Sequence, residues 1–163
     1  MIGEAPLRTA ARSALRLTKT SQVEVSRSLA SVEMATALFV CLHNAGRSQM
    51  SAALFERVSD GRHKALSAGT TPAERVHPEV VEVMREIGVD LADRKPQKLT
   101  PELAQHADVV VTMGCGDECP FIPGKQYVEW DLTDPKGLPV DEVRAIRDDI
   151  AQRVEALSSR LDS

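Results

Sequence analysis

A buried strand that passes through a short loop directly into a helix is the feature that most restricts the fold of this chain. The residues from Ala37 to Val40 are apolar and partly β-branched, as in a buried parallel strand. The stretch from Ser48 to Ser59 has the spacing of an amphipathic helix, with an apolar stripe formed by Met50, Ala53, Leu54 and Val58. A strand followed so closely by a helix favours an α/β fold.

The loop between these elements reads C-L-H-N-A-G-R from Cys41 to Arg47 and is followed by Ser48. At a turn from strand to helix, backbone N–H groups and the positive end of the helix dipole point at one spot and can bind an anion. Arg47 adds a planar fork of donors that suits a tetrahedral oxyanion. The same field favours thiolate over thiol at Cys41, and Ser48 can donate a hydrogen bond to the sulfur. We therefore expect Cys41 to be a nucleophile, and we expect the oxyanion to be bound by His43, Asn44, Ala45, Gly46, Arg47 and Ser48.

The same loop would also fit a buried structural cysteine beside an arginine that only solvates a helix. Two neighbours favour the catalytic interpretation. Gly46 permits a backbone conformation with positive φ, and Asn44 can brace a loop through its side chain. The strand before the loop and the helix after it supply the structural context that an anion site needs.

Two further cysteines follow the apolar run Val109–Val111, which predicts another buried strand. Cys115 comes just past the expected C-terminal end of this strand, where open α/β sheets bind their ligands. Cys119 follows it in the run C-G-D-E-C. An odd number of cysteines in a chain without a secretory signal favours thiol exchange over a structural disulfide.

A zinc site is the alternative use of this cysteine pair. The spacing of Cys115 and Cys119 would suit half of such a site. The chain has no second cysteine pair, and its four histidines are scattered along the sequence. We therefore expect no metal site.

Strand and helix patterns alternate along the rest of the chain. Further strands are expected at Ala65–Thr70 and Tyr127–Trp130, and helices at His77–Ile87, from Thr100 to near Ala107, and after Pro139. Strands that alternate with helices predict a mostly parallel sheet with helices on both faces.

Asp134 completes the set of candidate catalytic residues. In the predicted sheet, Cys41, Cys115 and Asp134 all follow the C-terminal ends of strands and so share one edge. A carboxylic acid at this edge suits proton delivery to an oxygen that leaves a bound oxyanion. A turn residue before Pro135 is the alternative role for Asp134.

From Thr36 to the C-terminus, the chain resembles the arsenate reductases built on the low-molecular-weight protein tyrosine phosphatase fold, of the three-cysteine type that is coupled to thioredoxin. The motifs that carry this resemblance are C-L-H-N-A-G-R-S-Q-M (41–50), S-A-G-T (67–70), H-P-E-V-V (77–81), V-V-T-M-G-C-G-D-E-C-P (110–120) and W-D-L-T-D-P-K-G (130–137). The resemblance implies a three-layer α/β fold whose four-stranded parallel sheet has the order 2-1-3-4.

The resemblance also implies roles for the cysteines. Cys41 attacks arsenate while Arg47 and the loop amides hold it, Cys115 acts as the second thiol and Cys119 as the third. The implied function is reduction of arsenate to arsenite, with thioredoxin as the electron donor and no tightly bound cofactor.

The chain departs from the family pattern at three places. Gly46 stands where the phosphatases usually carry a second cysteine before the loop arginine. Lys136 and Gly137 replace the aromatic pair that grips an aryl substrate in those enzymes, and only 3% of the chain is aromatic. Ala52 stands where some thioredoxin-coupled reductases place a glutamate that binds potassium, which puts a potassium site in doubt.

Two other functions stay open on the sequence alone. One is a phosphatase of phosphomonoesters or phosphotyrosine, which would need only Cys41, Arg47 and Asp134. The other is a non-catalytic module that binds metalloids or takes part in redox exchange. Cys115 and Cys119 favour the reductase over the phosphatase, and the intact loop favours either enzyme over the module.

Composition excludes several other classes. A net charge of −4 and an isoelectric point near 5.6 argue against nucleic acid as a partner. No apolar run approaches the roughly 20 residues that a membrane span needs, so we expect a cytoplasmic protein without a membrane partner. Residues 1–33 lie outside the resemblance and are expected to form an N-terminal extension, disordered or helical, before a domain of residues 34–163.

Overall fold

The computed structural model describes residues 33–114 and 123–163. The expected extension therefore lies almost entirely outside the described residues, as do Cys115 and Cys119. The described residues belong to the second of two compact units, which spans Met34–Ser163.

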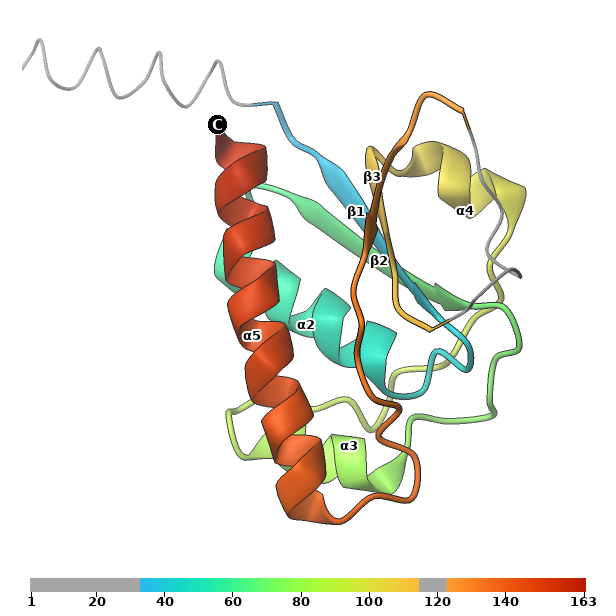
Figure 1. Ribbon diagram of the computed structural model, residues 1–163, viewed down its shortest axis with the longest axis vertical. Helices are drawn as coiled ribbons and strands as arrows, with labels where there is room; N and C mark the ends of the chain where they lie inside the picture. Colours follow the sequence, from blue (N-terminus) through green and yellow to red (C-terminus); the bar gives the residue numbers. More distant parts are fainter. Residues whose placement is uncertain (1–32, 115–122) are drawn as a thin grey trace, which may run out of the picture. The chain divides into compact units, whose positions relative to one another are not determined.

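The centre of this unit is a four-stranded sheet in which all strands are parallel (Figure 1). The strands are β1 (Thr36–Cys41), β2 (Lys64–Gly69), β3 (Val109–Thr112) and β4 (Gln126–Glu129). Their order across the sheet is β2-β1-β3-β4, which confirms the predicted topology. The strand that leads into the cysteine loop thus lies between β2 and β3.

Helices cover both faces of the sheet, as predicted. They are α2 (Arg47–Ser59), α3 (Pro78–Arg85), α4 (Pro101–His106) and α5 (Val140–Asp162). Figure 1 shows α2, α3 and α5 on one face, with α4 on the other. The long α5 packs on α2 and on α3.

The alternating side chains of β1 explain why its sequence is apolar throughout. Ala37, Phe39 and Cys41 belong to the core cluster on the face of α2 and α5, whereas Leu38 and Val40 belong to the cluster on the face of α4. All of these side chains are buried. A central parallel strand is covered on both faces, so it needs apolar residues at every position.

The helix expected at His77–Ile87 is shorter in the structure, where α3 ends at Arg85. Its first turn carries Pro78, as predicted. The chain leaves the helix through Gly88, which has a φ of 82°, and the N–H of Val89 donates to the carbonyl of Met84 (3.0 Å). A left-handed glycine closes a helix in this way, because it lets the chain reverse onto the last free carbonyls.

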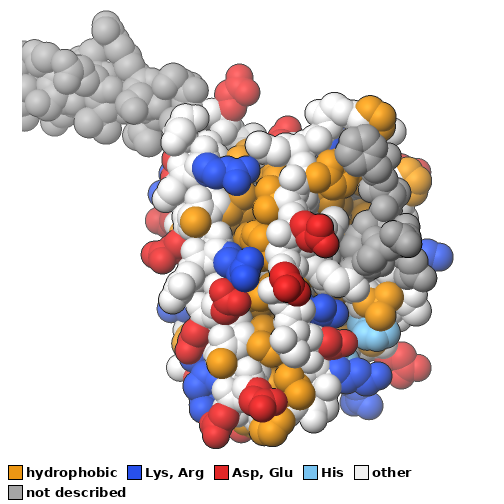
Figure 2. Space-filling view, viewed as in Figure 1, with side chains coloured by type: hydrophobic (Ala, Val, Ile, Leu, Met, Phe, Trp, Pro, Cys, Tyr) orange, Lys and Arg blue, Asp and Glu red, His pale blue; other side chains and the backbone are white. Residues whose placement is uncertain are grey.

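Figure 2 shows acidic and basic side chains interspersed over one face of the molecule. Among the described residues, Met34 is the large apolar side chain that is mostly exposed. None of the described helices is both long and apolar enough to cross a membrane.

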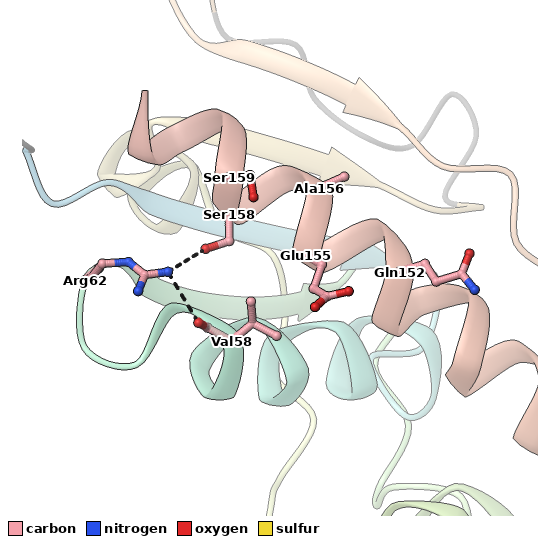
Figure 3. A pocket seen from close by; sticks show the side chains of 7 residues that line it. All are labelled: Val58, Arg62, Gln152, Glu155, Ala156, Ser158 and Ser159. Carbon is pink, nitrogen blue, oxygen red and sulfur yellow. Dashed lines mark hydrogen bonds between the residues drawn. The ribbon is translucent and has the colours of Figure 1, made fainter.

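A hollow of about 430 Å³ lies between the end of α2 and the C-terminal half of α5 (Figure 3). Arg62 lies beside it and donates to the carbonyl of Val58 (3.4 Å) and to the hydroxyl of Ser158 (3.4 Å). This hollow is at the opposite end of α2 from the cysteine loop, so it is not part of the candidate site.

An ion cluster joins α3 to α5. Arg147 is buried and donates to the carbonyl of Val83 (2.8 Å) and to Glu86 (2.8 Å), while Arg144 holds the other carboxylate oxygen of Glu86 (2.7 Å). The hydrogen bond from Arg144 lowers the pKa of Glu86 from 4.5 to about 2, and the bond from Arg147 acts in the same direction.

This cluster predicts a specific loss of stability in acid. Because the pKa of Glu86 is lower in the folded state, its contribution is complete above pH 4.5 and is lost as the pH falls toward about 2. In urea unfolding at a series of pH values, Glu86→Gln should therefore destabilise the protein at pH 6 and approach wild type near pH 2.

Glu155→Gln on α5 is the matched control, because Glu155 has no ion pair among the described residues. It should follow the wild-type stability at every pH. A constant difference between Glu86→Gln and wild type down to pH 2 would contradict the predicted linkage.

Candidate active site

The loop from Cys41 to Arg47 is fastened by its outward-facing carbonyl groups. Backbone N–H groups of the segment 70–77, which follows β2, bind these carbonyls. The bonds run from Thr70 to Cys41 (3.3 Å), from Thr71 to Leu42 (2.8 Å), from Ala73 to His43 (2.9 Å) and from His77 to Ala45 (2.9 Å). The carbonyl of Asn44 accepts from the side chain of Gln49 instead (3.1 Å).

The N–H groups of the same loop are left free on the other side. In a trans peptide the C=O and the following N–H point in opposite directions, so carbonyls that face outward turn the next N–H groups inward. Within the described residues, the free N–H groups are those of Leu42, His43, Ala45 and Gly46. Successive free N–H groups at a helix N-terminus form a nest for an anion.

The sulfur of Cys41 lies on the inner side of this loop. The N–H of Asn44 points at it (3.2 Å), and the hydroxyl of Ser48 lies 2.9 Å away. Asn44 reaches this position with a φ of 51°, in the left-handed region. Cys41 is free and almost fully buried. The sulfur therefore lies within hydrogen-bonding distance of both a backbone N–H and a hydroxyl group.

Arg47 is the first residue of α2, and its guanidinium points into the site. The residue as a whole is 6% exposed. One terminal nitrogen donates to the carbonyl of Leu132 (3.2 Å), and the other lies 3.7 Å from a carboxylate oxygen of Asp134. Its Nε is buried and has no partner among the described residues. A buried donor without an acceptor is costly, by about 1–3 kcal/mol, so Nε is suited to an oxygen of an incoming oxyanion.

Gly114 brings the chain after β3 against this guanidinium. It has a φ of 86°, and a Cβ at this position would overlap the Arg47 side chain. Only glycine therefore fits. The next residue in the chain is Cys115, which lies outside the described residues, as does Cys119.

The carboxylate of Asp134 makes one contact within a turn and one toward Arg47. One carboxylate oxygen accepts from the N–H of Lys136 (3.0 Å), as in a turn, and the other faces Arg47. The carboxylate is 40% exposed, so it can exchange protons with solvent. Pro135 packs on Gly46 so closely that a Cβ there would lie 2.7 Å from the proline Cγ.

Two histidines lie at the loop, His43 within it and His77 beside it. His43 contributes its backbone to the oxyanion loop, and its ring bonds the carbonyl of Thr71 (3.0 Å). His77 was not expected in the site, yet its ring lies against the Gly46 position. Burial lowers the pKa of His77 below 6.5, while the carboxylates of Glu79 and Asp134 oppose this shift.

Two glutamines were also not expected in the site. Besides its bond to the Asn44 carbonyl, Gln49 donates to the side-chain oxygen of Asn44 (3.1 Å), which also accepts from the N–H of Gln97 (2.9 Å). The Asn44 amide nitrogen then donates to Ser48 (2.7 Å). The only sequence signal for Gln49 was its place directly after the loop motif. Gln97 lies far away in the sequence and carried no signal.

The described residues contain no cluster of three or more His, Cys, Asp or Glu side chains that could hold a metal ion. Ala52, where some relatives would have a potassium ligand, is buried. The chemistry that these residues support is nucleophilic attack by a sulfur on a bound oxyanion, with a carboxylic acid nearby.

The contact between Gly114 and Arg47 predicts an effect on anion binding. Gly114→Ala should displace the guanidinium and weaken binding of inorganic phosphate by about tenfold or more, since a charge-assisted bond of roughly 1.5–3 kcal/mol is disturbed. The measurement is protection of Cys41 from alkylation at increasing phosphate concentrations.

Gly124→Ala is the control for backbone strain. Gly124 has a similar φ of 87°, but no atom lies within 4 Å of its Cβ position. Both variants should lose stability through left-handed strain of about 1–2 kcal/mol, whereas phosphate affinity should fall only in Gly114→Ala. Equal affinities in the two variants would show that Gly114 does not position Arg47.

Comparison with known proteins shows that the chain is similar to arsenate reductases. The chain is 46% identical over 121 residues to a Halobacterium salinarum protein provisionally named an arsenate reductase, covering 71% of this chain and 85% of that protein. It is 30% identical over 131 residues to the glutaredoxin arsenate reductase of Synechocystis, covering 78% of this chain and 99% of that protein.

A solved structure shows the same fold. The thioredoxin-dependent arsenate reductase of Corynebacterium glutamicum superimposes with a TM-score of 0.70 at 36% identity, covering 83% of this chain and 68% of that one. A family model described as low molecular weight phosphotyrosine protein phosphatase matches residues 36–163. The chain therefore belongs to the low molecular weight phosphotyrosine protein phosphatase family.

Proposed function

We propose that this protein reduces arsenate to arsenite. The observation that carries the proposal is the loop around Cys41, in which a buried sulfur lies with N–H groups and a buried Arg47 Nε that have no partner among the described residues. Relatives with this fold are named arsenate reductases. Arsenate is a tetrahedral oxyanion of the size and charge that such a loop suits.

In the first step, the Cys41 thiolate attacks arsenic and a sulfur–arsenic bond forms while an arsenic–oxygen bond breaks. Arsenic stays in its +5 state. Asp134 supplies a proton, so that the leaving oxygen departs as water. The free loop N–H groups and Arg47 stabilise the negative charge on the remaining oxygens.

The next two steps move electrons and need the other cysteines. The Cys115 thiolate attacks the sulfur of Cys41; a disulfide forms, the sulfur–arsenic bond breaks, and its electron pair reduces arsenic to arsenite. Cys119 then attacks Cys115 and releases the Cys41 thiolate. The product is a Cys115–Cys119 disulfide. Gly114 supports this role for Cys115, because Gly114 directly precedes Cys115 in the chain and lies against Arg47.

An external dithiol must reduce that disulfide in every cycle. We propose thioredoxin as this donor, as in the name of the Corynebacterium glutamicum relative. The name of the Synechocystis relative points to glutaredoxin instead. A relay of free thiols needs a reducing compartment, so we place the protein in the cytoplasm. We also propose that residues 34–163 carry the activity and that residues 1–33 are an extension.

Phosphatase activity is the second candidate function. The family model is described as low molecular weight phosphotyrosine protein phosphatase, and Arg47, which ends the loop that begins at Cys41, lies 3.7 Å from Asp134. Such an enzyme would need neither Cys115 nor Cys119. An aryl-phosphate hydrolysis assay beside the arsenate assay separates the two functions.

The shared loop predicts that one pair of substitutions abolishes both activities. Cys41→Ser removes the nucleophile, and Arg47→Ala removes the anion clamp, so each should lower arsenate-dependent NADPH oxidation with thioredoxin and its reductase by at least about 10³-fold. Lys98→Ala, an exposed cation outside the loop, is the control and should stay near wild type. Full reductase activity in Cys41→Ser would exclude the mechanism.

The sequential roles of the other cysteines predict different products. Cys115→Ser should release no arsenite, because no thiol can attack the Cys41 adduct. Cys119→Ser should complete about one turnover and stop as a Cys41–Cys115 disulfide, because nothing resolves that bond. Peptide mass mapping and arsenite quantification without external thiol would detect both outcomes. Normal turnover of Cys119→Ser with thioredoxin, or support of the wild type only by a small thiol with a glutaredoxin, would contradict the relay.

A further inference from the structure

Gln49 is a buried amide at the start of α2 that makes two hydrogen bonds to one residue of the loop. It is 2% exposed, and its amide nitrogen donates to the main-chain oxygen (3.1 Å) and the side-chain oxygen (3.1 Å) of Asn44. We infer that Gln49 is a positioning residue that, together with the backbone N–H of Gln97, sets the direction of the hydrogen bonds ending on the Cys41 sulfur. Its importance for turnover rests on the proposed function.

The direction of these hydrogen bonds follows from backbone groups, whose roles as donor or acceptor are fixed. A backbone carbonyl can only accept, so the group of Gln49 that meets the Asn44 carbonyl must be its NH₂ end. The N–H of Gln97 can only donate and also points at the side-chain oxygen of Asn44 (2.9 Å). Two donors at that atom fix it as the oxygen, and the opposite end of the Asn44 amide must then be its NH₂ group.

This orientation propagates to the nucleophile. The Asn44 NH₂ group donates to the hydroxyl oxygen of Ser48 (2.7 Å). The Ser48 hydrogen is then free to donate to the sulfur of Cys41, which lies 2.9 Å away. Every bond in the series points its hydrogen toward the sulfur, and bonds aligned in this way polarise one another. The series therefore ends with a hydrogen bond donated to the Cys41 sulfur.

Gln49 has a second effect through the loop backbone. The carbonyls of Cys41, Leu42, His43 and Ala45 accept from backbone N–H groups of the segment 70–77, but the carbonyl of Asn44 accepts from Gln49. This bond fixes the peptide between Asn44 and Ala45, and so it directs the free N–H of Ala45 into the anion nest. One side chain thus supports both the nucleophile and the anion site.

The test measures the reactivity of Cys41 without turnover. In a protein carrying Cys115→Ser and Cys119→Ser, Cys41 is the single remaining cysteine of the three in the chain, and its alkylation by iodoacetamide reports ionised sulfur. Gln49→Met keeps the length of the side chain and removes both donors. Its alkylation at pH 7 should be about fivefold to tenfold slower, the factor expected for one net hydrogen bond, and should approach the parent rate at pH 9.5.

Gln152→Met is the control, because Gln152 is exposed on α5 and lies outside the loop and the segments that support it. It should alkylate at the parent rate. Phosphate should also protect Cys41 less well in Gln49→Met than in this control. Parent-like alkylation of Gln49→Met at pH 7, or an equal loss at pH 7 and pH 9.5, would overturn the inference.

Two further measurements keep the outcome decisive. If Gln49→Met does not fold, hydrogen exchange of the Gln49 side-chain NH₂ in the parent protein provides the answer. It should be slower than exchange of the exposed Gln152, and equal rates would overturn the inference. If the alkylation results hold but wild type reduces no arsenate, the proposed function fails while the positioning role of Gln49 stands.

Discussion

The carbonyl groups of the loop from Cys41 to Arg47 are the constraint on which the rest of the site depends. Each bond from the segment 70–77 turns one peptide outward and points the next N–H group to the inner side, toward the Cys41 sulfur in the case of Asn44. The candidate anion site is therefore built mainly from backbone groups, supported by the side chains of Arg47 and Gln49. A loop that lost these outer bonds would also lose the inward direction of its donors.

The strand order explains how one loop can be supported from several sides. Because β1 lies between β2 and β3, the chain beyond β2 supplies the donors for the loop carbonyls, and the chain beyond β3 supplies Gly114 to the arginine. The segment after β4 then brings Asp134 toward Arg47. In a parallel sheet all of these segments leave the same edge, so functional residues from distant parts of the chain meet there.

Much of this arrangement could be predicted from local sequence patterns. The strand and loop around Cys41 were predictable because burial on both faces and an anion-binding turn each leave a local signature. Gln97 and Gly114 were not predictable, because their roles depend on contacts with Asn44 and Arg47 that only the folded chain creates. The role of Cys115 and Cys119 stays a prediction, since both lie outside the described residues.

The contact between Gly46 and Pro135 has a consequence for how this site can change in evolution. The related phosphatases usually have a cysteine at the position of Gly46, and any side chain there would collide with the proline ring. A larger residue at position 46 therefore requires the segment around Pro135 to shift, so the substitutions that are tolerated at positions 46 and 135 are expected to depend on each other.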